Sequence, residues 1–360
     1  MSRSRFGATA LTLFLLLAAC GGTASTTTAA PATTSPATTN PTTTTAAAAE
    51  TTTTTGAETE ETTTTTEAPV EMMDIKVSLI PILDFAPMYL GLQEGIFEKH
   101  GLNVELEELF SSPGLVSSVT SGASDIATTS ATQGVTGISN GLPVKIVSNG
   151  SFSPPTGNTE ILVLPDSDIQ GFADLAGKTV STVALQGLFH LGTLSAVENA
   201  GGDWTTVEAI PGQQPELADA LAAGRVDAIV IQEPFLSAFI RDYGFRSLGN
   251  PYADLGYSIP AGVWISSIEQ TEAEPEKMRR FRAAMAEANQ FAVDNDAMLR
   301  ELIPTFTSLT AEQVADISLP IFDGNLPPES LTAMGESMLA FGWLRYIPSY
   351  NQVVWEDTGA

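Results

Sequence analysis

The stretch ALAAGRVDAIVIQEP, residues 220–234, contains the pattern that decides how this chain folds. Its middle, from Val226 to Gln232, is an apolar run rich in β-branched residues and is typical of a strand. The run lies between helical stretches, and Pro234 sits well at the start of the second one. A strand placed between helices is the repeating unit of layered α/β domains.

Seven further runs of the same kind recur between helical stretches. They are IKVSLIP (75–81), NVELEELF (103–110), SDIATT (124–129), PVKIVSN (143–149), EILVLP (160–165), KTVSTVA (178–184) and AGVWIS (261–266). This alternation predicts an α/β fold with mostly parallel sheets and crossover helices. The 287 residues from Asp74 to the end are enough for one large domain or two of ordinary size.

The last 90 or so residues contain almost no strand signal. Residues 275–295 read as an amphipathic helix with Pro275 near its start. Its apolar stripe consists of Met278, Phe281, Met285 and Phe291. Shorter helices are expected near residues 309–317 and 327–343, which gives the chain a helical C-terminal segment.

The N-terminus has the pattern of a secretory signal peptide, expected to span residues 1–19. Arg3 and Arg5 precede an apolar run that ends at Ala19 and is too short to cross a bilayer. Leu-Ala-Ala-Cys at residues 17–20 resembles a bacterial lipobox, in which Cys20 takes a diacylglyceryl group; the alternative is an incidental cysteine in a discarded leader. Because Cys20 is the single cysteine, intramolecular disulfides and cysteine-built zinc sites are excluded.

Residues 20–73 are dominated by Thr, Ala, Pro and scattered Glu, and this composition is typical of a disordered tether. About 50 flexible residues would reach on the order of 40 Å. The whole chain has 15 Lys and Arg against 42 Asp and Glu, and only six of these acids lie in the tether, so the rest of the chain is itself acidic. Nucleic acid and anionic lipid are therefore poor partners, although such acidity is also explained by solubility alone.

Four motifs in one order carry a resemblance to a known family. The first is APMYLGLQEGIFEKHGLNVELEE at residues 86–108, followed by Gly122 with Asp-Ile-Ala at 125–127. Then come DLAGKTV at 174–180 and the stretch 220–234 quoted above. Together they resemble the SsuA/THI5-like (NMT1-like) solute-binding proteins of ABC importers for sulfonates, taurine, nitrate and thiamine pyrimidines.

The resemblance implies a type II periplasmic-binding-protein fold with two lobes. One lobe would comprise residues 74–160 and 262–360, the other residues 161–261, with crossovers near 157–163 and 259–265. It implies a monomeric, extracytoplasmic lipoprotein that binds a small-molecule ligand in the cleft and delivers it to an ABC permease and its ATPase. No enzyme activity, cofactor or nucleic-acid partner is expected, and the membrane is contacted through the N-terminal lipid.

Ligands of open α/β sheets gather beyond the carboxyl ends of strands, near the N-termini of helices. This rule selects side chains that follow the predicted strands of both lobes, together with one aromatic residue in a crossover. The candidates are Asp84, Phe85, Ser111, Ser112, Thr129, Ser130, Gln186, Gly187, His190, Gln232, Glu233 and Trp264.

Each candidate has an ordinary structural alternative. The four hydroxyl residues precede helices and could be N-caps, and Glu233 could complement a helix dipole beside Pro234. Phe85, Phe152, Phe189, Phe235 and Trp264 could all belong to the core. His190 is a lone histidine, and with His100 it makes no cluster that could bind a metal.

The candidate loops contain no Lys or Arg but do contain Asp84 and Glu233. Aromatic faces beside a carboxylate favour a flat heterocycle with amino groups, such as an aminopyrimidine or a flavin-like ring. A sulfonate, taurine or nitrate held by helix N-termini and hydroxyls remains open. Two other functions also remain open: an enzyme on this fold, similar to the pyrimidine synthases, and a surface scaffold lipoprotein.

Overall fold

The computed structural model describes residues 71–357, all of which belong to one compact unit of the chain, Thr66–Ala360. The predicted signal peptide, Cys20 and nearly all of the predicted tether lie outside the described residues. Among the helices of residues 71–357, none is both long enough and apolar enough to cross a membrane.

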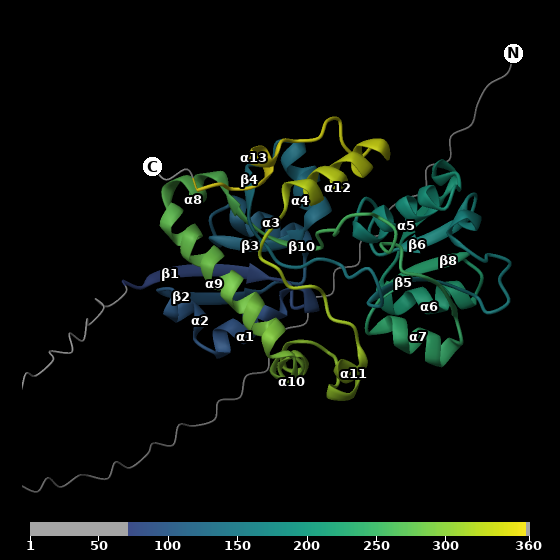
Figure 1. The fold of residues 1–360 in the computed structure, drawn as a ribbon, viewed down its shortest axis with the longest axis horizontal. Helices are drawn as coiled ribbons and strands as arrows, with labels where there is room; N and C mark the ends of the chain where they lie inside the picture. Colours follow the sequence, from purple (N-terminus) through teal and green to yellow (C-terminus); the bar gives the residue numbers. More distant parts are fainter. Residues whose placement is uncertain (1–70, 358–360) are drawn as a thin grey trace, which may run out of the picture. The chain divides into compact units, whose positions relative to one another are not determined.

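The described residues form two five-stranded sheets, one in each of two lobes (Figure 1). The sheet of lobe 1 has the order β2-β1-β3-β10-β4, and its strands are β1 (Met73–Leu79), β2 (Leu102–Glu108), β3 (Ile126–Ser130), β4 (Val144–Asn149) and β10 (Gly262–Ser267). The sheet of lobe 2 has the order β7-β6-β8-β5-β9, and its strands are β5 (Thr159–Val163), β6 (Thr179–Thr182), β7 (Glu208–Pro211), β8 (Ala228–Gln232) and β9 (Arg246–Gly249).

Four of the five strands in each sheet run in the same direction, which confirms the prediction of mostly parallel sheets. The exceptions are β10 in lobe 1 and β5 in lobe 2, each antiparallel to both of its neighbours. Each of these strands is the one by which the chain enters a lobe from the other lobe. A chain that enters from the space between the lobes must run away from it, whereas β1, β3, β6 and β8 end beside it.

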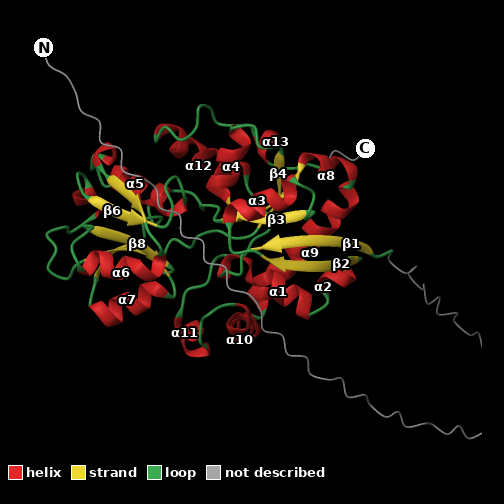
Figure 2. Ribbon diagram, turned by 180° about the vertical axis from the view of Figure 1, so that it is seen from behind, coloured by secondary structure: helices red, strands yellow, loops and turns green. Residues whose placement is uncertain are grey.

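Helices cover both faces of each sheet (Figure 2). Lobe 1 contains α1 (Ala86–Gln93), α2 (Ile96–Lys99), α3 (Ser112–Thr120), α4 (Ala131–Ser139), α8 (Ile268–Ala273), α9 (Pro275–Asp294), α10 (Asp296–Phe306), α11 (Ala311–Asp316), α12 (Pro328–Ala340) and α13 (Tyr350–Val353). Lobe 2 contains α5 (Leu188–Asn199), α6 (Gln214–Ala222) and α7 (Phe235–Tyr243). Short 3-10 helices span Leu83–Phe85, Phe172–Leu175 and Trp204–Thr206.

The strand in the stretch 220–234 shows why the sheets need two helical layers. Ile229 and Ile231 pack with residues of α6 and α7 on one face of the lobe 2 sheet. Ala228 and Val230 alternate with them and pack with residues of α5 on the other face. All four side chains are fully buried, as expected for a strand whose side chains point alternately to two covered faces.

The predicted amphipathic helix is α9, which begins at Pro275 and ends at Asp294. Met278, Phe281 and Met285 are buried in the core of lobe 1, and Phe291 packs against it from a partly buried position. The sequence patterns missed several elements, among them the short edge strands β7 and β9, the short helices α8 and α13, and α10, which contains Pro304. Among the described residues after β10, every regular element is helical, as predicted.

Two crossovers connect the lobes, residues 150–158 between β4 and β5 and residues 250–261 between β9 and β10. The crossovers expected at 157–163 and 259–265 overlap these segments only at one end, because most of each range belongs to β5 or β10. A third segment joins them: Phe152 exchanges backbone hydrogen bonds with Ile321, and Asn158 Nδ2 donates to the Ser318 carbonyl at 2.8 Å. The first crossover therefore lies between the second crossover and residues 318–324.

The lobes also meet through an aromatic contact between α5 and the end of α12. The His190 ring lies 4.9 Å from that of Trp343, and Trp204 lies 4.9 Å from Phe341 in an edge-to-face arrangement. One buried cluster includes residues from both sides, such as Leu191 and Met338. The two lobes thus share part of their hydrophobic core beside the crossovers.

Candidate functional site

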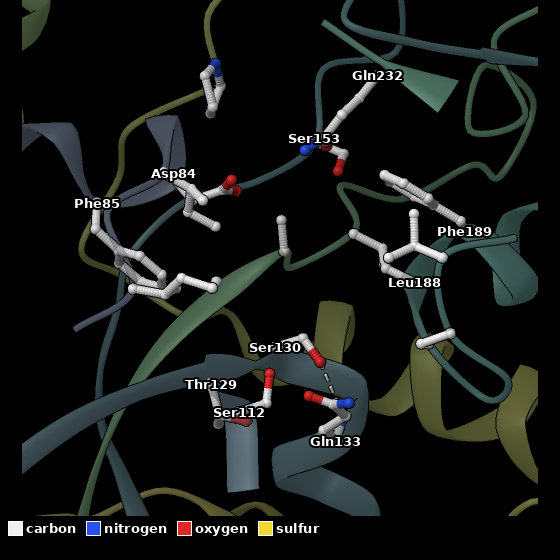
Figure 3. Close-up of a pocket in the computed structure, with 18 of the residues that line it drawn as sticks. Asp84, Phe85, Ser112, Thr129, Ser130, Gln133, Ser153, Leu188, Phe189 and Gln232 are labelled. Atoms are coloured by element: carbon white, nitrogen blue, oxygen red, sulfur yellow. Dashed lines mark hydrogen bonds between the residues drawn. The ribbon is translucent and has the colours of Figure 1, made fainter. Parts of the chain in front are cut away.

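A pocket of about 230 Å³ lies between the lobes, where β1, β3, β6 and β8 end and β10 begins. Its lining comes from both lobes and from the crossovers, as Figure 3 shows for its main residues. The lining is mostly apolar with a few polar groups, which is the usual composition of a small-molecule site. This position is the one expected for ligands of α/β sheets, beyond the carboxyl ends of strands.

The lobe 1 wall provides a carboxylate and several hydroxyl groups. Asp84 and Phe85 lie in the 3-10 helix after β1, Ser112 begins α3, and Thr129 and Ser130 end β3. In Figure 3 the three hydroxyl residues gather on one side with Gln133, and Asp84 lies apart from them. Apolar side chains of Ile80, Ile82 and Leu115 complete this wall.

The lobe 2 wall is more apolar. The turn after β6 and the first residues of α5 supply Val183, Ala184, Gly187, Leu188 and Phe189. Its polar side chains are those of Gln214, the first residue of α6, and Gln232, the last residue of β8. Phe189 lies across the pocket from Phe85 in Figure 3.

Asp84 is the only ionisable side chain among the described residues that line the pocket. Its carboxylate points into the pocket in Figure 3, and its Oδ1 accepts a hydrogen bond of 2.6 Å from the Ser151 hydroxyl. Burial raises the pKa of the Asp84 carboxyl above its ordinary value, and the Ser151 hydrogen bond acts in the opposite direction. A ligand group that donates hydrogen bonds, or a positive charge, would compensate for the buried carboxylate.

Seven of the twelve residues predicted for the site line this pocket. They are Asp84, Phe85, Ser112, Thr129, Ser130, Gly187 and Gln232. Ser130 is also the N-cap of α4, where its hydroxyl accepts from the Gln133 N–H at 3.3 Å. The pocket and the cap are thus compatible roles for one side chain.

The other five residues lie outside the lining. Ser111 is the N-cap of α3, and Trp264 is fully buried with its ring against Phe85 and Phe281. The carboxylate of Glu233 is buried and accepts from both the hydroxyl and the N–H of Ser237, so it binds the first turn of α7. These are the structural roles that the sequence offered as alternatives.

The remaining two, Gln186 and His190, are joined to each other. The N–H of Gln186 donates to Nδ1 of His190 at 3.0 Å. The His190 ring packs near Trp343, and burial lowers its pKa to about 4. The imidazole is therefore neutral at pH 7. His190 therefore holds the turn before α5 in place, behind the lining residues Gly187 to Phe189.

Sequence reasoning missed four polar residues of the lining: Gln133, Ser153, Asn158 and Gln214. Gln214 follows β7, an edge strand that the patterns did not reveal. Ser153 and Asn158 belong to the first crossover; Ser153 precedes the range expected for it, and Asn158 lies inside that range but was not among the candidates. Gln133 lies one turn into α4, three residues after Ser130, and this helical spacing was the available signal.

Four helices begin at the pocket, namely α3, α4, α5 and α6. The first two have serine N-caps, but α5 begins after Gly187 with no side-chain cap. Free N–H groups at the start of a helix attract negative or polar atoms. The site can therefore offer backbone donors from α5, hydroxyls from lobe 1 and one carboxylate acceptor to a single bound molecule.

Two lobes, each built on a five-stranded sheet and joined by crossovers, define the periplasmic-binding-protein fold. Residues 82–297 match the model of the family described as NMT1/THI5 like, and the chain belongs to this family. The match includes every residue of the pocket lining except Ile80 and Pro320. A comparison with curated proteins finds no match to this chain.

Solved structures of low sequence identity share the fold. The periplasmic aliphatic sulphonate binding protein SsuA of Escherichia coli has a TM-score of 0.66 at 17% identity, covering 79% of this chain and 92% of its own. The alkanesulfonate-binding protein SsuA of Xanthomonas axonopodis pv. citri, bound to MOPS, has 0.62 at 20%, covering 80% and 99%. The Candida albicans CA3427 gene product, described as having the generic periplasmic binding protein fold, has 0.61 at 14%, covering 80% and 99%.

Proposed function

We propose that this protein is an extracytoplasmic solute-binding lipoprotein of an ABC importer. It captures a small organic molecule between its lobes and delivers it to a permease, acting by binding and not by catalysis. The observation that carries the proposal is the pocket at the strand ends of two lobes joined by crossovers. Family membership and the shared fold of sulfonate-binding proteins support it.

The ligand that we favour is an aminopyrimidine or a flavin-like heterocycle that bears amino groups. Asp84 provides the acceptor for an amino donor, and the lining includes no Lys or Arg that would neutralise it. Phe85 and Phe189 lie on opposite sides of the pocket and offer apolar faces to a flat ring. A pocket of about 230 Å³ suits a small ring system.

Calorimetry and tryptophan fluorescence against a panel of aminopyrimidines, flavins, alkanesulfonates, taurine and nitrate would test this function. We expect an amino-bearing heterocycle to bind, pyrimidine without the amino group to bind at least tenfold more weakly, and the radius of gyration to fall on binding. Turnover of any ligand would show that the protein is an enzyme and would overturn the proposed receptor function. Failure to bind across the whole panel would favour the surface scaffold.

A sulfonate or another anion is the second candidate. The start of α5 supports it, because this helix reaches the pocket with no side-chain cap on its first N–H groups. Hydroxyls of Ser112 and Ser130 could add donors from lobe 1. In the panel above, this candidate predicts that alkanesulfonates bind and that raising the pH above 7 leaves their affinity unchanged.

We propose that Cys20 carries the lipid that anchors the chain to the membrane. The arginines, the short apolar run and the Leu-Ala-Ala-Cys sequence support this assignment. Metabolic labelling with radioactive palmitate should mark the wild-type chain and leave the Cys20→Ser variant unlabelled. Release of the wild-type chain from membranes by salt alone would contradict the anchor.

A further inference from the structure

The Asp84 carboxylate is held from behind by a buried serine that does not line the pocket. Ser151 is fully buried in the first crossover, and its hydroxyl donates to Asp84 Oδ1 at 2.6 Å. The Oγ atom of Ser151 also accepts a hydrogen bond of 3.3 Å from the N–H of Gly262, the first residue of β10. The hydroxyl proton and one lone pair of Ser151 are thus both committed, which fixes the rotation of its side chain.

The backbone around Ser151 is fixed as firmly as its side chain. The Ser151 N–H donates to the Gly262 carbonyl at 3.2 Å, and the Ala261 N–H donates to the Ser151 carbonyl at 2.9 Å. These bonds join the two crossovers at the point where they pass behind Asp84. The position of the Ser151 hydroxyl is therefore determined by both crossovers together.

Close packing leaves the turn of Asp84 little room to move. A Cβ atom at Gly262 would lie 2.7 Å from the Phe85 ring and 3.3 Å from Cβ of Asp84. At Gly150 a Cβ atom would lie 2.9 Å from the Phe85 ring. Glycine at both positions lets the Asp84–Phe85 turn rest directly on the crossovers.

We propose that Ser151 is a positioning residue for ligand recognition: it orients the Asp84 carboxyl group toward the pocket. This inference rests on the proposed function, in which Asp84 accepts from an amino group of the ligand. A binding group of this kind is effective only when neighbouring residues hold it in place. A hydrogen bond to an ionised group also stabilises the charge that burial disfavours.

The test compares Ser151→Ala with the wild-type full chain in two measurements. The first needs no ligand: the Asp84 carboxyl is titrated by ¹³C NMR of labelled aspartate and assigned by its loss in Asp84→Asn. Because the Ser151 hydroxyl stabilises the ionised form, its removal should move the Asp84 titration to higher pH. The second is the affinity for 4-aminopyrimidine at pH 7, which should fall about tenfold.

Ser266→Ala is the matched control. Ser266 is also fully buried, and its hydroxyl donates to the Asp125 carbonyl, away from the pocket. This variant loses one buried hydroxyl of similar environment, and its Asp84 titration should match the wild type. Ser151→Cys keeps a weak donor and should titrate between the wild type and Ser151→Ala, which provides a second variant if the alanine variant folds poorly.

The outcomes separate this inference from the proposed function. If Asp84 titrates at the same pH with and without the Ser151 hydroxyl, Ser151 does not position the carboxylate and the inference is overturned. If the titration moves but the wild type does not bind 4-aminopyrimidine, the role of Ser151 stands and the ligand class is wrong. If binding is lost in Asp84→Asn but unchanged in Ser151→Ala at every pH, the function stands without this inference.

Discussion

The two walls of the pocket differ in what they offer and in how firmly it is held. The lobe 1 wall carries the Asp84 carboxylate and several hydroxyls. The Ser130 hydroxyl also caps α4, and the Asp84 carboxylate accepts a hydrogen bond from Ser151. Lobe 2 presents mainly apolar side chains from one turn and the start of α5. Under the proposed function, lobe 1 would bind the polar groups of a ligand and lobe 2 would cover it with apolar surface.

The largest effect is expected from Asp84→Asn, which replaces the carboxyl group of the pocket lining by an amide of nearly the same shape. Loss of a charge-assisted hydrogen bond should weaken binding of an amino-bearing heterocycle by about tenfold to a hundredfold in calorimetry. Glu233→Gln is the control, since this carboxylate binds Ser237 outside the lining. If Glu233→Gln lost affinity and Asp84→Asn did not, the two acidic residues would have to exchange roles.

On the lobe 2 side, Phe189→Ala should weaken binding by about tenfold, because an aromatic side chain no longer covers the ligand. Phe235→Ala is the matched control: Phe235 lies in the same lobe, packs against Phe239 and is outside the lining. Calorimetry of both variants against the same ligand measures the difference. Equal affinity of the two would show that lobe 2 contributes little to binding.

A smaller effect separates the two roles of the serine caps. Ser111→Ala and Ser130→Ala each remove an N-cap and should each lower the free energy of unfolding by about 1 kcal/mol in urea titrations. Only Ser130 lines the pocket, so only its variant should also bind ligand several-fold more weakly. Unchanged affinity in Ser130→Ala would limit this residue to capping α4.

The last prediction concerns His190, which holds the turn before α5 in lobe 2. Its pKa is lowered from 6.5 to about 4 by burial, so the unfolded chain binds a proton at a higher pH than the folded chain. Stability should therefore fall as the pH decreases from about 6.5 toward 4, and this part of the loss should be absent in His190→Leu. Urea unfolding at pH 7 and pH 5 tests this; an equal loss in both proteins would contradict it.

Most of the strands that could be predicted from sequence are buried on both faces; the exception is the edge strand β2, which is largely exposed. Residues 226–232 have alternate side chains packed against α5 on one face and α6 and α7 on the other, so nearly every position had to be apolar. The edge strands β7 and β9 lack this constraint, and their residues are partly or fully exposed. Without a continuous apolar run they left no pattern to detect.

The sequence predicted those residues of the site that lie at or just after the ends of predicted strands. Asp84, Thr129 and Gln232 follow predicted strands and line the pocket. Glu233 lies in the turn between β8 and α7, where its carboxylate accepts hydrogen bonds from Ser237 at the start of α7. The sequence pattern did not show which of these two side chains would face the pocket, because that depends on where the strand ends and the turn begins.

By itself the sequence determined the α/β class, the buried strands, the long C-terminal helix and the family to which the chain belongs. These follow from local periodicity and from short motifs, which are properties of neighbouring residues. Only the tertiary structure decided that β5 and β10 run antiparallel, that Ser151 supports Asp84 and that His190 meets Trp343. Each of these joins residues far apart in the chain, and such contacts depend on how whole elements pack.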